Sequence, residues 1–177
     1  MRIFQGIVLF TGLVLTGPVL AQGTDSLAAF RSSLVEVPDV TRPVGGTIYT
    51  PAYASIRLGS GRAAMRLAAT LSIHNSSESL PLVLERVDYF DTAGNLIQAA
   101  LPRPIAVKPF ATVEFYIPED DLRGGSGANF VVTWSAQGPI AEPMAEAIMI
   151  GTIGNASYSF VSQGRPVRIV DGPSSPR

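Results

Sequence analysis

The chain reads RGGSGANFVVTW over residues 123–134, where a glycine cluster runs directly into an apolar segment that ends at the only tryptophan. Glycine adopts positive φ without a side-chain clash, so the cluster predicts a tight turn or a bulge. The residues after it alternate between a polar and an apolar set, which is the period of a β-strand with one buried face. The apolar set is Phe130, Val132, Trp134 and Ala136. We interpret the stretch as a structural motif that depends on Gly124, Gly125, Gly127, Asn129 and Trp134.

Other segments repeat this period. In residues 64–75 every second residue from Met65 to Ile73 is apolar and the residues between them are mostly polar, which predicts a strand with one face in the core. In residues 82–90 the apolar positions change phase, which predicts a β-bulge near Glu85 and Arg86. Seven or eight short strands separated by turn signals, without a long helical period, favour an all-β fold. We expect an antiparallel β-sandwich of immunoglobulin-like character.

The first residues have the pattern of an export signal. Arg2 precedes an apolar run over residues 7–15, and Gly17 and Pro18 then break any helix. We expect residues 1–21 to be a cleaved signal peptide, with cleavage after Ala21. The alternative, an uncleaved membrane anchor, is disfavoured because residues 7–20 fall short of the roughly 20 apolar residues that span a bilayer.

The remaining chain divides into three parts. Residues 22–46 are polar and contain Pro38 and Pro43, so we expect a flexible linker with one short segment at helical spacing. Residues 47–165 hold the predicted strands and form the expected β-sandwich domain. Residues 166–177 are rich in proline and serine and predict a loose C-terminal tail.

Composition excludes several classes of protein. The formal net charge is −1, so the chain lacks the strongly basic character of a nucleic-acid binder. There is no cysteine, which removes disulfides, thiolate nucleophiles, sulfur-based zinc sites and lipid attachment of the bacterial lipoprotein kind. Together with the leader, this predicts a periplasmic or secreted protein with no stable membrane span after cleavage.

Catalytic candidates are few. His74 is the only histidine, and with Ser126 and Asp91 it would supply the residue types of a serine-hydrolase triad. However, the serine does not lie in a Gly-x-Ser-x-Gly elbow, because Ala128 takes the place of the last glycine. A surface histidine is the simpler interpretation.

Acidic residues offer two further hypotheses. Glu119, Asp120 and Asp121 precede the glycine cluster, and clustered carboxylates are the ligands that calcium prefers. The alternative is a solvated acidic turn. A glycosidase-like carboxylate pair drawn from Glu85, Asp88 and Asp91 is less favoured than exposed strand and turn acids.

Several short motifs together resemble the bacterial domain-of-unknown-function family 3124. They are residues 124–130 (GGSGANF), 148–152 (IMIGT), 159–164 (SFVSQG), 71–75 (LSIHN) and 88–91 (DYFD). The resemblance runs from about Ile48 to Gly164. It implies an exported, mostly β protein and carries over no activity and no catalytic residues.

From the sequence, then, we expect an exported, non-catalytic β-sandwich that acts as a binding or accessory module of the cell envelope. Its partner would be an envelope protein or a glycan. The alternatives are a hydrolase-like enzyme that uses His74 and a calcium-stabilised domain; no other cofactor is expected.

Overall fold

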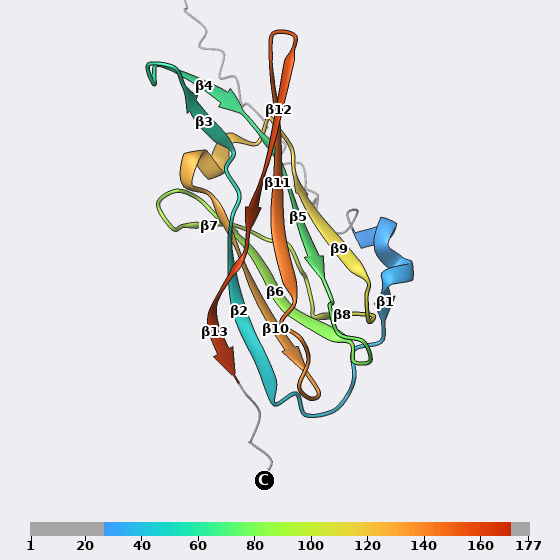
Figure 1. Ribbon diagram of the computed structural model, residues 1–177. Helices are drawn as coiled ribbons and strands as arrows, with labels where there is room; N and C mark the ends of the chain where they lie inside the picture. Colours follow the sequence, from blue (N-terminus) through green and yellow to red (C-terminus); the bar gives the residue numbers. More distant parts are fainter. Residues whose placement is uncertain (1–26, 171–177) are drawn as a thin grey trace, which may run out of the picture.

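The computed structural model describes residues 27–170, and antiparallel strands dominate this part of the chain (Figure 1). A seven-stranded sheet has the order β1 (Leu34–Val35), β8 (Ile105–Val107), β6 (Leu82–Phe90), β10 (Asn129–Ala136), β2 (Val44–Pro51) and β13 (Arg165–Val170), and β7 (Leu96–Ala99) also pairs with β6. A four-stranded sheet has the order β12 (Ala156–Gln163), β11 (Met144–Ile153), β5 (Ala68–His74) and β9 (Thr112–Ile117). The predicted all-β, antiparallel fold is confirmed.

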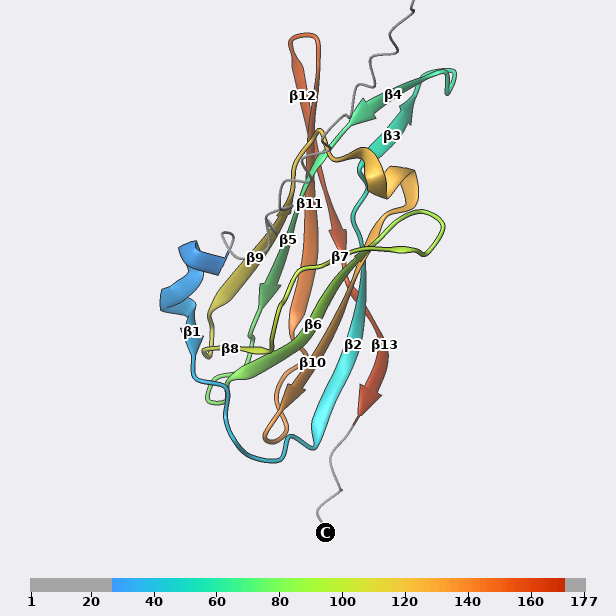
Figure 2. The same ribbon diagram turned by 180° about the vertical axis from the view of Figure 1, so that it is seen from behind.

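Smaller elements complete the fold. β3 (Ser55–Leu58) and β4 (Ala63–Arg66) form a separate hairpin, and two 3₁₀ helices, η1 (Leu27–Ser33) and η2 (Leu122–Gly127), precede β1 and β10. The β3–β4 and β11–β12 hairpins project from the same end of the molecule (Figures 1 and 2). β2 begins at the opposite end, so that end is free of both hairpins.

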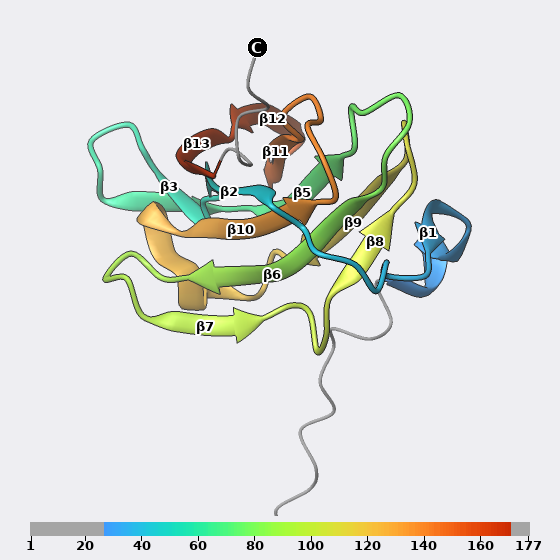
Figure 3. The same ribbon diagram turned by 90° about the horizontal axis from the view of Figure 1, so that it is seen from below.

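The core lies between the two sheets, which are seen end-on in Figure 3. In β5 the alternate residues Ala69, Leu71 and Ile73 are fully buried, and in β10 the predicted apolar set is buried through to Ala136. Each large apolar side chain contributes roughly 1.5–3 kcal/mol on burial, before the cost of ordering the chain. Trp134, which is 4% exposed, lies in this core.

The bulge expected in β6 is present. Thr133 pairs with Arg86 and Trp134 pairs with Leu84, so Glu85 is the extra residue on β6. This single insertion lets the apolar residues on both sides of it face the core despite their change of phase. Leu82, Leu84, Val87 and Tyr89 are all fully buried.

The predicted number of strands was too low, since residues 27–170 form thirteen. Among the strands that were not predicted, β1 and β8 have only two and three residues, and residues 64–75, expected as one strand, are divided between β4 and β5. Segments of two or three residues are too short to show an alternation between buried and exposed positions, so their sequences cannot be distinguished from those of turns.

The ordered strands also extend beyond the predicted domain boundaries. Within the predicted linker, η1, β1 and the start of β2 are formed, and Leu27, Phe30 and Leu34 pack against the core. Within the predicted tail, residues 166–170 belong to β13, which pairs with β2. The predicted signal peptide, residues 1–21, lies outside the described residues.

A single residue carries the chain from one sheet to the other. Gly164 lies between β12 and β13, and its amide donates a hydrogen bond to the carbonyl oxygen of Ala145 (2.7 Å). A Cβ atom at this position would lie 2.6 Å from that oxygen and 2.6 Å from Oγ1 of Thr50. The crossing therefore has no space for a side chain.

Gly164→Ala should lower the free energy of unfolding by about 1–3 kcal/mol, because the two sheets must separate locally to admit the methyl group. Chemical denaturation of both proteins measures this. Gly138→Ala is the matched control, since a Cβ there meets only Cδ1 of Leu80, at 3.6 Å. Equal stability of the Gly164 variant and the control would contradict the close approach at the crossing.

Candidate functional site

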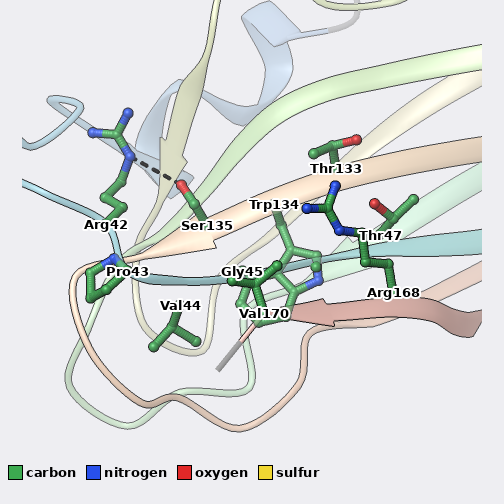
Figure 4. Close-up of a pocket in the computed structure, with 11 residues that line it drawn as sticks. Arg42, Pro43, Val44, Gly45, Thr47, Thr133, Trp134, Ser135, Arg168 and Val170 are labelled. Atoms are coloured by element: carbon green, nitrogen blue, oxygen red, sulfur yellow. Dashed lines mark hydrogen bonds between the residues drawn. The ribbon is translucent and has the colours of Figure 1, made fainter. Parts of the chain in front are cut away.

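A pocket of about 160 Å³ lies where β2 begins, between β10 and β13 (Figure 4). Its lining comes from the segment before β2 and from three adjacent strands: Arg42, Pro43, Val44, Gly45, Gly46, Thr47, Thr133, Trp134, Ser135, Arg168 and Val170. Along each strand the side chains alternate between the core and the outer face, and the polar side chains of the lining are on the outer face. The pocket therefore opens on the outer face of the seven-stranded sheet.

The hollow exists because Gly45 has no side chain. Gly45 pairs with Ser135 of β10 on one side and with Val170 of β13 on the other. Cross-strand partners share a face, so the position between those two side chains is empty. A Cβ at Gly45 would also lie 2.6 Å from the carbonyl oxygen of Trp134, and the close backbone therefore requires glycine.

Arg42 is fixed at one rim of the pocket. Its Nε donates to Oγ of Ser135 (3.0 Å) and to Oε1 of Glu85 (3.2 Å), and its Nη1 donates to the carbonyl oxygen of Pro38 (2.9 Å). Ser135 in turn donates to the same oxygen of Glu85 (2.5 Å). The bulge residue Glu85 thus neutralises Arg42 and holds the serine hydroxyl in place.

Arg168 stands on the other side of the pocket without such a partner. Its guanidinium makes no hydrogen bond or ion pair with any of residues 27–170, and the residue is exposed. Figure 4 shows it extending from β13 beside Thr47 and Thr133. Neither threonine hydroxyl has a hydrogen-bond partner within the described residues. Free donors therefore gather on this side.

The chemistry of the lining suits binding. Guanidinium and hydroxyl groups recognise anions and sugar hydroxyls by hydrogen bonding. Hydrolytic catalysis would need a nucleophile held against a base. The one serine of the lining is bonded to Glu85 and Arg42, and the lining contains no histidine.

The family described as "Protein of unknown function (DUF3124)" matches residues 45–167, which is more than half of the chain. The chain belongs to this family. The match confirms the resemblance expected from the short motifs. Its limits include the pocket residues from Gly45 to Ser135 and leave out Arg42, Pro43, Val44, Arg168 and Val170. No curated protein matches. A solved structure titled "Crystal Structure of Thermotoga maritima 1070" is similar with a TM-score of 0.40 and 9% sequence identity, over 68% of this chain and 92% of that chain.

The three residues weighed as a possible triad in this DUF3124 protein do not come together. His74 ends β5, whereas Leu67, just before β5, bonds to Ala54, which bonds to Gly125 of η2. Leu67 therefore marks the end of the molecule where η2 and Ser126 lie. His74 is seven extended residues further along the chain, which places it about 20 Å from that end. Asp91 lies at the η2 end as well, because its neighbour Thr92 bonds to Gly124.

His74 instead contacts hydroxyl groups on the outer face of the four-stranded sheet. Its Nδ1 lies 2.8 Å from Oγ1 of Thr112 and its Nε2 lies 3.1 Å from Oγ of Ser72, with Oε1 of Glu146 at 4.0 Å. Ser72 is only 3% exposed, so it could not attack a bound substrate. These contacts give no support to the hydrolase alternative.

The other carboxylates proposed from the sequence have structural partners. Asp88 forms an ion pair with Arg86, Glu85 binds Arg42 and Ser135, and Asp91 accepts hydrogen bonds within the turn that follows β6. The bonds from Asn95, through its side chain and then its backbone, hold the pKa of Asp91 below its usual value. None of the three is left free to act as one of a carboxylate pair.

Asp121 is also engaged. It caps η2 through the amide of Arg123, and its oxygens accept from Nε (2.8 Å) and Nη2 (2.6 Å) of the same arginine. The hydrogen bond from the Arg123 side chain lowers the pKa of Asp121. Within residues 27–170 no three His, Cys, Asp or Glu side chains are grouped so that they could hold a metal ion, and this includes Glu119, Asp120 and Asp121.

The glycine motif forms a 3₁₀ turn where a tight turn or bulge was expected. Gly125 has a φ of +70°, while Gly124 and Gly127 have no positive φ. A side chain at Gly124 would collide with Oη of Tyr89, and one at Gly127 would meet Thr92. Asn129 opens β10 and is buried. The motif therefore packs against the hydroxyl end of Tyr89, whose ring lies 4.9 Å from that of Phe130.

Sequence reasoning missed the pocket. Arg42 fell in the predicted linker and Arg168 in the predicted tail, so neither was considered. The outward threonine and serine of β10 were recognised as the polar side of a strand, and the Gly45–Gly46 pair at a strand start was a further usable signal. No helix of the described residues is long and apolar enough to cross a membrane.

Calcium binding at Glu119, Asp120 and Asp121 is the alternative hypothesis from the sequence, and thermal unfolding tests it. We expect the same Tm in millimolar calcium and in chelator, because Arg123 already occupies both oxygens of Asp121 and a ligand stabilises only what it binds. A calcium-dependent rise in Tm that disappears in Asp121→Asn would place calcium at this turn.

The raised pKa of Tyr89 leads us to expect a loss of stability at high pH. Burial, followed by the nearby Asp121 carboxylate, raises the pKa of Tyr89 to about 12, although Arg123 acts in the opposite direction. The unfolded chain loses this proton near pH 10, so the folded state binds more protons between pH 10 and 12 and stability falls with pH there, by at most about 1 kcal/mol per unit. Urea denaturation of Tyr89→Phe should show a smaller fall than the wild type over that range and a parallel course from pH 7 to 9. Identical slopes would contradict this.

Proposed function

We propose that this protein is an exported, non-catalytic binding or accessory module of the cell envelope, located in the periplasm or secreted, which holds its ligand on the outer face of the seven-stranded sheet. The pattern of residues 1–21 supports export. The two antiparallel sheets of short strands support, as part of the same proposal, an immunoglobulin-like arrangement. The partner is an envelope protein or a glycan.

The pocket over Gly45 is the observation that carries the proposal. One rim is held rigidly by the contacts among Arg42, Glu85 and Ser135, while Arg168 and two threonines leave their donors unused within the described residues. A site with fixed walls and free donors loses little side-chain entropy when a ligand binds, and this is how binding sites gain affinity.

Trp134 provides a test, because the backbone of the only tryptophan of the chain lines the pocket and its indole packs against Gly46, next to Gly45. The purified protein is titrated with bacterial envelope extract, separated into glycan and protein fractions, while tryptophan fluorescence is recorded. We expect a saturable change with one fraction. Thr133→Val should weaken binding about three- to tenfold through loss of one hydrogen bond.

Thr152→Val is the matched control, since Thr152 is exposed on the β11–β12 hairpin at the other end of the molecule. It should bind as the wild type does. Saturable turnover of a substrate, abolished by one substitution, would overturn the non-catalytic proposal. Absence of binding by both fractions would overturn the binding proposal.

A further inference from the structure

Within residues 27–170, the outer face of the seven-stranded sheet carries an excess of positive charge. Four arginines stand on or beside the strands around the pocket, and two carboxylates accompany them: Arg42, Arg86, Arg165, Arg168, Glu85 and Asp88. The whole chain, by contrast, has a formal net charge of −1. The excess is therefore a property of this face, which attracts anions.

The register of the strands sets the arginines in a row. Arg168 of β13 pairs with Thr47 of β2, Thr47 pairs with Thr133 of β10, and Thr133 pairs with Arg86 of β6. Neighbouring strands are about 4.8 Å apart, so the row is about 14 Å long from the first strand to the last. In this row two threonines thus lie between two arginines.

The arginines differ in whether a carboxylate already pairs with their guanidinium group. Asp88 pairs with Arg86, and Glu85 pairs with Arg42. Arg168 has no partner among residues 27–170, and its position beside Thr47 lets guanidinium and hydroxyl bind one group together. A guanidinium matches the two oxygens of a carboxylate, sulfate or phosphate group, which makes an oxyanion the natural occupant.

The lining favours a sugar as the carrier of that oxyanion. Protein partners bind through large apolar anchors that enter apolar pockets. Here the lining holds two arginines and three hydroxyl side chains, and its apolar members are small aliphatic groups beside the edge of the indole: Pro43, Val44, Val170 and Trp134. Tyr49, 39% exposed and two residues from Thr47, adds an aromatic ring beside the hydroxyl row. Hydroxyl donors flanked by one aromatic ring suit a polyhydroxyl ligand.

We propose that the pocket over Gly45 is an oxyanion subsite for an acidic glycan, in which Arg168 binds the carboxylate, sulfate or phosphate group and Thr47 and Thr133 bind the sugar. This inference rests on the proposed binding function and assigns the class of its ligand. Arg42 and Arg86 border the subsite, and their paired carboxylates keep the remainder of the face from attracting anions indiscriminately.

The test compares four polymers by tryptophan fluorescence, with calorimetry as a second measurement: polygalacturonate, dextran sulfate, neutral dextran and polyglutamate. We expect saturable binding of polygalacturonate or dextran sulfate, the two arms that separate a carboxylate from a sulfate ligand, and weaker binding as salt rises. Neutral dextran and polyglutamate should bind at least about tenfold more weakly.

Arg168→Gln should weaken binding of the acidic glycan at least about tenfold, because a charge-assisted contact is lost. Arg168→Lys, which keeps the charge without the fork of donors, should give an intermediate affinity. Arg62→Gln is the matched control, since it removes the same charge from the exposed β3–β4 turn, and it should bind within about twofold of the wild type. Unchanged Tm values establish that the variants are folded.

Three results would overturn the inference. If Arg168→Gln binds acidic glycans as the wild type does, the subsite is elsewhere. Tighter binding of polyglutamate through Arg168 would assign an acidic protein as the partner. Equal binding of neutral dextran, or no binding of any polymer, would contradict the oxyanion subsite. The proposed binding function would be contradicted only if both envelope fractions also failed to bind.

Discussion

The indole of Trp134 lies over Gly46, and much of the molecule depends on this contact. A Cβ at Gly46 would come within 2.9 Å of the indole Nε1 and 2.7 Å of the carbonyl oxygen of Arg168, so only glycine lets the ring lie between the sheets at this point. The neighbouring Gly45 points to the other face, where its missing side chain leaves the pocket. Two successive glycines therefore make room for the core on one side of the sheet and for the pocket on the other.

The pocket requires β13 as much as it requires the glycines. β13 reaches β2 only because the chain crosses between the sheets at Gly164, where no side chain fits. Once across, the pairing with β2 sets Arg168 opposite Thr47 and Val170 opposite Gly45. Gly164, which must be glycine for the chain to cross, immediately precedes the strand that carries Arg168. A packing requirement in the core thus determines the position of an arginine on the surface.

Periodicity predicted those parts of the fold in which one face is buried and the other exposed. The alternation in β5 and β10 and the phase change at Glu85 are of this kind, because burial imposes a period of two and an extra residue shifts it. β13 gives no such signal, since all six of its residues are exposed. It is a strand because β2 offers it hydrogen-bond partners, and a partner distant in sequence cannot be read from a local pattern.

The same reasoning explains why the candidate site escaped sequence analysis while the histidine and the acidic run attracted attention. Residue type singled out His74 and Asp121, but in the structure hydroxyls surround the first and Arg123 occupies the second. The pocket instead joins Arg42, Thr133 and Arg168, which are common residue types from three segments separated by more than thirty positions each. Their significance comes from the register of the strands and from which charges are already paired. Because Glu85 satisfies Arg42 and leaves Arg168 without a partner in the described chain, the bulge in β6 influences which arginine is available to a ligand.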